Sequence, residues 1–237
     1  MSELLIVKTT EDMGRIGAEM IASEVMGNPE IVLGLATGSS PVSLYKELVR
    51  MHKEEGLDFS GVRTVNLDEY AGLPTDHPQS YRSFMNENLF DHINIDPANT
   101  HLPDGMAEDL DKEWARYDRL VDELLGIEIQ VLGIGPNGHI GFNEPSDEFS
   151  KHTMVVPLTV ETIEANARFF GSAAEVPREA ITLDIRHIMQ ANKILLVATK
   201  NKKEILKKAL EGRISPLVPA SVLQLHRDVT VIFSEEE

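Results

Sequence analysis

The sequence contains no cysteine among its 237 residues. Disulfide bonds, zinc sites built on thiolates and thiol nucleophiles are therefore excluded, and nothing requires an oxidising compartment. Long apolar runs are also missing, since no stretch approaches the roughly 20 apolar residues that span a bilayer. The chain begins Met1-Ser2-Glu3, which has no basic residue, and no long apolar segment follows. We therefore expect no signal peptide and a cytoplasmic location.

Basic residues are scarce: 22 Lys and Arg stand against 39 Asp and Glu, which gives a formal net charge of −17. A surface this acidic repels nucleic acids and anionic lipids, because binding them depends on cations that neutralise phosphate groups. We therefore expect no nucleic-acid or membrane partner. A phosphorylated small molecule would need a local basic pocket, so the few well-placed basic residues become informative.

Short apolar, β-branched runs alternate with amphipathic helical patterns along the chain. The runs predict buried strands at residues 4–7, 31–35, 62–67, 129–134, 194–198 and 229–233. The alternation predicts an α/β fold with a doubly wound, mostly parallel, Rossmann-like sheet in a single domain over residues 1–237. Residues 149–177 are the least regular, and we expect them to form a partly helical flap over the active site. Ligands of such sheets bind outside the carboxyl ends of the strands.

The first candidate segment follows the second predicted strand and reads Gly34-Leu35-Ala36-Thr37-Gly38-Ser39-Ser40-Pro41. We expect Ser40 to cap the next helix and Pro41 to be its first residue. A glycine-bearing turn of this kind exposes backbone N–H groups at a helix N-terminus, which suits phosphate. It is not a Walker A loop, because no Gly-Lys-Ser/Thr follows. An ordinary capped turn explains the same residues about equally well.

Two adjacent carboxylates, Asp68 and Glu69, follow the third predicted strand. Either could act as a general base. Neighbours in a strand point to opposite faces, so only one of them should face a ligand. Acidic residues also follow strands as caps and turns, and in so acidic a chain this segment alone does not establish a catalytic role.

A glycine-rich loop over residues 133–145 contains Asn137, His139 and Glu144. Its opening matches G-x-G-x-x-G, but the glycines lead into a loop ending at Pro145, whereas the dinucleotide fingerprint opens a helix. We therefore expect no nucleotide cofactor. An imidazole and a carboxylate this close are suited to acid–base chemistry. Metal binding is disfavoured because no second histidine lies near, so no metal is expected.

Two basic residues, Arg168 and Lys202, are the remaining candidates. A basic side chain is by default a solvated surface charge. Lys202 has the better position, because it begins a helix just after a predicted strand and so lies at the carboxyl edge of the sheet.

Taken together, these segments resemble the glucosamine-6-phosphate deaminase family of sugar-phosphate isomerases. The resemblance extends over essentially the whole chain, and its most specific part is the stretch from His139 to Pro145. The related 6-phosphogluconolactonases share the fold, but they typically follow the histidine with Thr-Ala-Ser and have Asp-Glu-Arg in place of Asp68-Glu69-Tyr70. The other matching segments are residues 35–41, 66–70, 77–81, 167–170 and 223–226.

The resemblance implies conversion of glucosamine 6-phosphate and water to fructose 6-phosphate and ammonia, without a cofactor. It implies that Asp68 carries a proton from C2 to C1, and that His139 opens the sugar ring with support from Asn137 and Glu144. It further implies that phosphate and sugar are held by Thr37, Gly38, Ser39, Ser40, Arg168 and Lys202.

Two departures from the best-studied branch of the family bear on regulation and pH dependence. Asn137 stands where that branch has Asp, so the pH dependence of ring opening is expected to differ. The sequence ends at Glu237, without the C-terminal extension of the allosteric hexamers, and we therefore expect an unregulated monomer or small homo-oligomer.

Two alternative functions stay open. A lactonase-like hydrolase acting on 6-phosphogluconolactone would release acid instead of ammonia. A non-catalytic sugar-phosphate sensor is disfavoured, because Asp68 and His139 are both present and the first strand begins too early for a DNA-binding module.

Overall fold

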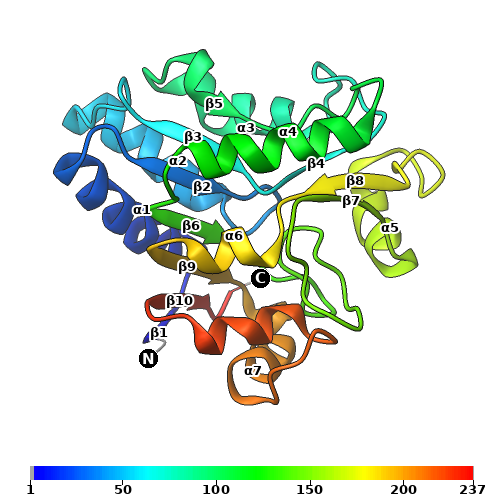
Figure 1. Cartoon of the computed structure of the whole chain (residues 1–237). Helices are drawn as coiled ribbons and strands as arrows, with labels where there is room; N and C mark the ends of the chain where they lie inside the picture. The colour runs from blue at the N-terminus through cyan, green and yellow to red at the C-terminus, as the bar shows by residue number, and fades with distance from the viewer. Residues whose placement is uncertain (1–2, 237) are drawn as a thin grey trace.

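The computed structural model describes residues 3–236 (Figure 1). Its centre is a seven-stranded sheet in the order β1-β10-β9-β6-β2-β3-β5, and all its strand pairs are parallel. The predicted α/β fold and its mostly parallel sheet are thus confirmed. The strands are β1 (Glu3–Val7), β2 (Val32–Leu35), β3 (Arg63–Asn66), β5 (Thr100–His101), β6 (Ile129–Leu132), β9 (Lys193–Ala198) and β10 (Val229–Ser234).

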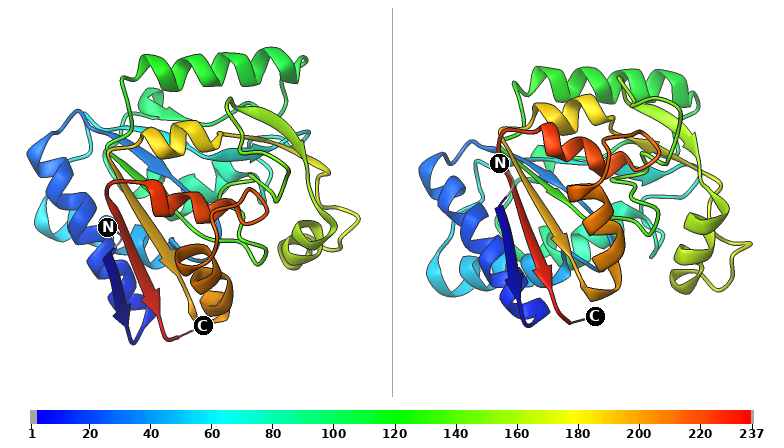
Figure 2. Two further views of the ribbon diagram at one scale, coloured as in Figure 1. Left: turned by 60° about the horizontal axis from the view of Figure 1, so that its bottom comes forward. Right: turned by 90° about the horizontal axis from the view of Figure 1, so that it is seen from below.

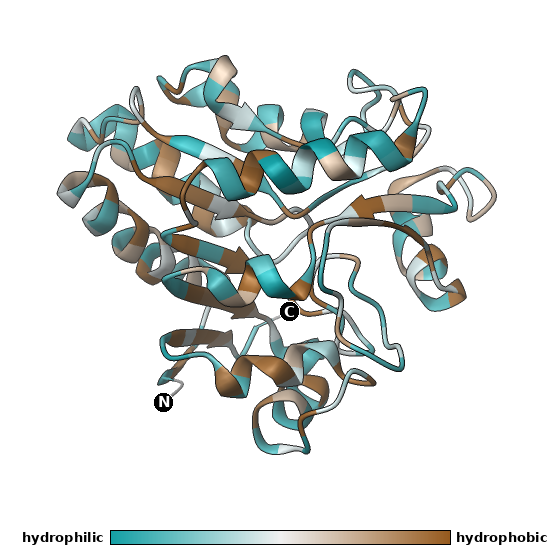
Figure 3. Cartoon of the chain, viewed as in Figure 1, coloured by the Kyte–Doolittle hydropathy of each residue, from teal (hydrophilic) through white to brown (hydrophobic). Residues whose placement is uncertain are grey.

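Helices cover both faces of this sheet, and each face has its own apolar core. Figure 3 shows that hydrophobic residues are concentrated in the central strands. Strand side chains alternate between the two, so Leu33 and Leu35 belong to one core while Val32 and Val65 belong to the other. The first core is covered by α1 (Thr10–Gly27), α2 (Val42–Arg50) and α3 (Tyr81–Asn88), and the second by α4 (Leu110–Glu123), α6 (Ile185–Gln190) and α7 (Lys203–Glu211).

The prediction that residues 4–7 form a buried strand was wrong about burial. Figure 2 shows β1 beside β10 at one margin of the sheet. As an edge strand, β1 leaves Leu4 49% and Ile6 62% exposed. In residues 3–236, no helix has both the length and the apolar character needed to cross a bilayer.

A second, three-stranded sheet of order β4-β8-β7 was not predicted. It is antiparallel and consists of β4 (Asp68–Tyr70), β8 (Glu179–Thr182) and β7 (Met154–Pro157). The segment expected to be a partly helical flap therefore contains strand β7 as well as helix α5 (Val160–Asn166). Its movement as a flap stays a prediction, as does the assignment of residues 1–237 to one domain.

The direction in which the chain winds through the parallel sheet reverses beside β2. The path from β2 through β3 to β5 runs to one edge, whereas the path from β6 through β9 to β10 runs to the other. Segments leaving β2 and β6 therefore diverge, which opens a crevice at their carboxyl ends. The turn after β2 and the glycine-rich loop after β6, two of the candidate segments, meet at this point.

Candidate active site

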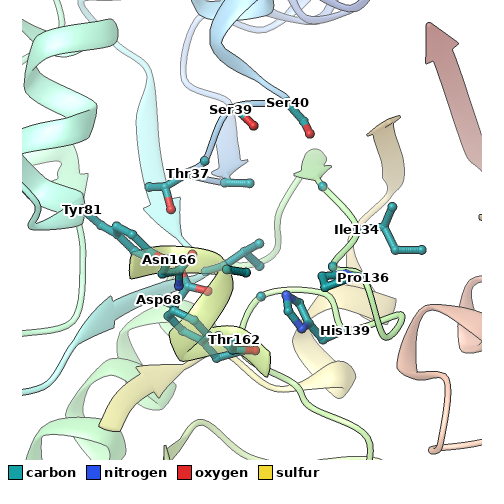
Figure 4. A pocket seen from close by; sticks show the side chains of 18 of the residues that line it. Thr37, Ser39, Ser40, Asp68, Tyr81, Ile134, Pro136, His139, Thr162 and Asn166 are labelled. Carbon is teal, nitrogen blue, oxygen red and sulfur yellow. The ribbon is translucent and has the colours of Figure 1, made fainter. Parts of the chain in front are cut away.

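A cavity of about 170 Å³ lies at this crevice (Figure 4). Its walls come from the carboxyl ends of β2, β3, β6 and β9, together with residues of α5 and the turn after it. All but two of the predicted site residues line it: Thr37, Gly38, Ser39, Ser40, Asp68, His139, Arg168 and Lys202. The other two, Asn137 and Glu144, contact each other behind His139.

The turn after β2 forms one end of the cavity, and Figure 4 shows Ser39 and Ser40 well separated from Asp68. Gly38 has φ +95°, in the left-handed region that favours glycine. The predictions that Ser40 caps α2 and that Pro41 is its first residue were both wrong, because the helix begins at Val42, Pro41 stands at the cap position and no side chain caps the helix. The Ser40 hydroxyl therefore has no capping role and lies on the cavity wall.

Arg168 and Lys202 come from different elements but line the same cavity. Burial, and next the nearby positive charge of Arg168, lowers the pKa of Lys202. Among residues 3–236 neither cation forms an ion pair with a carboxylate, although the Arg168 guanidinium lies 4.6 Å from the centre of the Phe169 ring. Two like charges next to hydroxyl groups are suited to an anionic ligand such as phosphate.

Asp68 is the carboxylate on the cavity wall, and its residue is only 5% exposed. Burial, followed by the negative charge of Glu69, raises the pKa of Asp68 to about 8, although the Phe142 backbone N–H partly offsets this. A carboxylate with a pKa this close to neutrality is a much stronger base than an ordinary aspartate. The position and the basicity of Asp68 both suit proton abstraction.

Glu69 has a structural position instead, because it points away from the cavity. Its Oε1 accepts hydrogen bonds from the backbone N–H groups of Tyr70 and Tyr81, and its Oε2 accepts one from Arg82, each at 2.9 Å. Two of these donors are at the N-terminus of α3, where a carboxylate is favoured. Glu69 therefore ties β4 to α3, and this contact fixes the start of the helix on which Tyr81 lies.

Replacing Glu69 with glutamine should reduce stability more than chemistry. The amide NH₂ would face N–H donors, leaving at least one buried N–H unpaired at a cost of about 1–3 kcal/mol. Removing the charge should also lower the pKa of Asp68, so the rising limb of kcat/KM moves to lower pH. Thermal unfolding and a pH–rate profile measure both effects. An unchanged unfolding temperature together with a collapse of kcat would contradict this assignment.

His139 is held close against the backbone of the glycine-rich loop. A Cβ at Gly135 would lie 2.1 Å from His139 Nε2, so only glycine leaves room for the imidazole. On the other side of the ring, Nδ1 lies 3.3 Å from Glu144 Oε2. A proton on Nδ1 facing this carboxylate leaves Nε2 as the basic nitrogen.

Glu144 connects the loop with α5. Burial opposes its ionisation, but His139, and then the hydrogen bonds from Thr162 and Asn137, lower the pKa of Glu144 to about 2. Asn137 donates from Nδ2 to Glu144 Oε2 over 2.7 Å, while its Oδ1 accepts from the His139 backbone N–H over 3.1 Å. Asn137 thus orients the histidine through its main chain, and Glu144 stays ionised beside the ring.

Several residues that line the cavity had no role predicted from the sequence. Tyr81 belongs to the 77–81 segment that carries the family resemblance, so a signal for it was present. Thr162 and Asn166 are four residues apart, which places them on one face of α5. Their helical spacing could be read from the sequence, but the docking of that face on the cavity could not.

One group of possible metal ligands occurs among the described residues, and none of its members lines the cavity. It consists of Asp118, Asp184 and His187. The His187 Nδ1 lies 2.6 Å from Asp184 Oδ2, and Arg186 lies 3.4 Å from Asp118 Oδ2. These contacts describe an ion-pair network between α4 and α6.

A buried carboxylate and an imidazole beside a second carboxylate thus lie at the switch point of a doubly wound sheet, which is where the ligands of α/β enzymes bind. The family profile described as glucosamine-6-phosphate isomerases/6-phosphogluconolactonase matches residues 8–232. The chain belongs to this family.

Relatives with high identity cover nearly the whole chain. A glucosamine-6-phosphate deaminase of Clostridium perfringens (strain SM101 / Type A) is 51% identical over 234 residues, which is 98% of this chain and 97% of the relative. A deaminase of Lachnoclostridium phytofermentans is 54% identical over 222 residues, which is 93% and 94% of the two chains. These relatives agree with the resemblance noted in the sequence.

Two solved structures match the chain over nearly its whole length. The structure of a monomeric glucosamine-6-phosphate deaminase superposes with a TM-score of 0.97 at 46% identity, covering 99% of this chain and 98% of that chain. A 6-phosphogluconolactonase of Thermotoga maritima gives a TM-score of 0.78 at 19% identity, covering 99% of both chains. The lactonase likeness shows the fold alone.

Proposed function

We propose that the protein is a glucosamine-6-phosphate deaminase, which converts glucosamine 6-phosphate and water to fructose 6-phosphate and ammonia. The observation that carries the proposal is the buried Asp68, whose pKa of about 8 suits a base, in the same cavity as the His139–Glu144 pair. The deaminases that share about half of their residues with this chain support it.

In the proposed reaction, phosphate occupies the end of the cavity formed by Ser39, Ser40, Arg168 and Lys202, with Thr37 and Gly38 against the sugar. His139 Nε2 accepts the proton of the O1 hydroxyl and then gives it to the ring oxygen O5 as the bond between O5 and C1 breaks. The ionised Glu144 stabilises the imidazolium that forms. Ring opening thereby produces the C1 aldehyde.

Asp68 then removes the proton on C2, while the cationic amino group gives a proton to O1, so that the C1 carbonyl becomes an enol and C2 carries a neutral amine. When Asp68 returns this proton to C1, the C2–N bond becomes an imine, which water hydrolyses to the ketone and ammonia. One carboxylate therefore serves as base and then as acid, for which a pKa near the working pH is favourable.

Parallel assays test the proposal directly. The protein is incubated with glucosamine 6-phosphate and, separately, with 6-phosphogluconolactone, and ammonia and acid release are measured. We expect ammonia and fructose 6-phosphate from the first substrate. Acid release from the second at a comparable rate, without ammonia from the first, would establish the lactonase alternative. Binding of both ligands without turnover would indicate a sensor.

Replacing Arg168 or Lys202 with alanine should mainly weaken substrate capture. Each change removes a charge-assisted contact to phosphate, typically about 1.5–3 kcal/mol, so KM should rise by roughly ten- to a hundredfold. The matched control is Lys200→Ala, an exposed lysine in the same turn as Lys202 that does not line the cavity. An equal loss with glucosamine lacking phosphate would show that these residues are not phosphate ligands.

The remaining expectations from the sequence concern the state of the protein in the cell. A monomer or small homo-oligomer is supported by the monomeric deaminase that shares 46% identity. Lack of regulation, absence of a nucleic-acid partner and a cytoplasmic location stay predictions.

A further inference from the structure

Helix α5 packs over the cavity in a defined orientation. Ile163 is buried in an apolar cluster with Tyr70 and Phe142. On the same side, Asn166 Nδ2 donates to the Tyr70 hydroxyl over 3.0 Å. Thr162, only 3% exposed, lies one turn earlier and lines the cavity, as Asn166 does. These contacts fix the direction in which the Thr162 side chain points.

The two oxygens of Glu144 are held from opposite sides. Oε1 accepts hydrogen bonds from the hydroxyl groups of Thr162 and Thr159, the second over 3.3 Å. Oε2 accepts from Asn137 and lies 3.3 Å from His139 Nδ1. The Glu144 carboxylate cannot turn away from His139 without breaking its hydrogen bonds to the α5 segment. Among the described residues, Thr159 and Thr162 alone form such bonds.

We propose that Thr162 is a positioning residue, which holds Glu144 against His139 and so makes ring opening depend on the placement of α5. The inference rests on the proposed deaminase function and assigns to this helix a part in the first chemical step. Thr162 acts through Glu144 and needs no contact with the reacting atoms. Of the two threonines it is the better candidate, because Thr159 also caps α5 and its bond to Glu144 is longer.

The test compares Thr162→Val, which keeps the shape but removes the hydroxyl, with Thr162→Ser, which restores it. In Thr162→Val we expect kcat for ammonia release to fall roughly tenfold, as is typical for losing one hydrogen bond to a charged group. Thr162→Ser should recover most of the activity. The matched control is Thr64→Val, since Thr64 is equally buried but its hydroxyl has no partner in the described residues.

Two further measurements separate positioning from a contact with substrate. Binding of an open-chain amino-alditol phosphate, which needs no ring opening, should be unchanged in Thr162→Val. In a Glu144→Gln background, Thr162→Val should have little additional effect, because both changes act on one interaction. Additive losses, or weaker binding of the open-chain ligand in proportion to kcat, would overturn the proposal.

Glu144 itself supplies a readout besides activity. Loss of a hydrogen-bond donor should raise the pKa of Glu144 above its value of about 2, which an NMR titration of its carboxyl carbon measures. An unchanged pKa with unchanged kcat would show that Thr162 holds nothing in place. If the unaltered protein releases no ammonia, the proposed function fails. If the unaltered protein releases ammonia and Thr162→Val has the same kcat, only the inference about Thr162 fails.

Discussion

Asp68→Asn is expected to lower kcat by about a hundred- to ten-thousandfold, the usual cost of removing a general base. Asparagine keeps the shape and the hydrogen-bonding capacity of the side chain, so substrate should still bind. The loss should be visible in ammonia release and in solvent deuterium incorporation at C1 of fructose 6-phosphate. Both signals report the proton that Asp68 is proposed to carry.

The neighbouring Glu69→Gln is the matched control, because both changes convert an acid to its amide on the same strand. The cavity is lined by Asp68, whereas Glu69 binds three backbone N–H groups, so the control should retain most of its kcat. Near-normal turnover in Asp68→Asn, with an inactive Glu69→Gln of native stability, would assign the base to the other carboxylate.

The pH dependence of kcat/KM gives a second signature of Asp68. The base must be ionised, and its raised pKa of about 8 means that kcat/KM should increase with pH up to that region. In the substrate complex, a cationic amino group near Asp68 would favour its ionised form, so the corresponding limb of kcat should lie at lower pH. If kcat/KM instead rose around pH 4, the ordinary pKa of an aspartate, the base would not be the buried Asp68.

The parallel sheet could be predicted because its strands are buried on both faces. Runs such as 194–198 are continuously apolar, and strand order then places the candidate residues at one edge. Asp68 and His139 lie on different segments, yet both follow strands of this sheet, and for this reason the sequence located them in one site. Their placement depends only on the topology of the parallel sheet, and the apolar strand runs are sufficient to predict that topology.

The antiparallel sheet could not be predicted for the opposite reason. Its strands have only three or four residues, and β4 consists of Asp68, Glu69 and Tyr70, which read as a polar turn. The pairing of β4 with β8 joins residues more than 100 positions apart, which no local pattern reports. The contribution of α5 to the cavity depends on this sheet, so Thr162 and Asn166 were missed.

His139→Gln is expected to lower kcat by roughly a hundred- to a thousandfold with the cyclic substrate, because glutamine cannot accept the O1 proton. The exposed His92→Gln is the matched control and should behave as the unaltered protein does. Binding of the open-chain amino-alditol phosphate should survive, since Asp68 and the residues proposed to bind phosphate are untouched.

The two catalytic defects can be told apart by their dependence on enzyme concentration. If His139→Gln lacks only ring opening, it still converts the open-chain fraction of the substrate. At high enzyme concentration its rate should therefore level off at the uncatalysed rate of ring opening, whereas the rate of Asp68→Asn should stay proportional to enzyme. Gly135→Ala tests the geometry independently, because its Cβ would lie 2.1 Å from the undisturbed Nε2 and must displace the ring. It should reproduce the levelling of His139→Gln while every catalytic side chain is retained, and a strictly proportional rate in both variants would place His139 outside the ring-opening step.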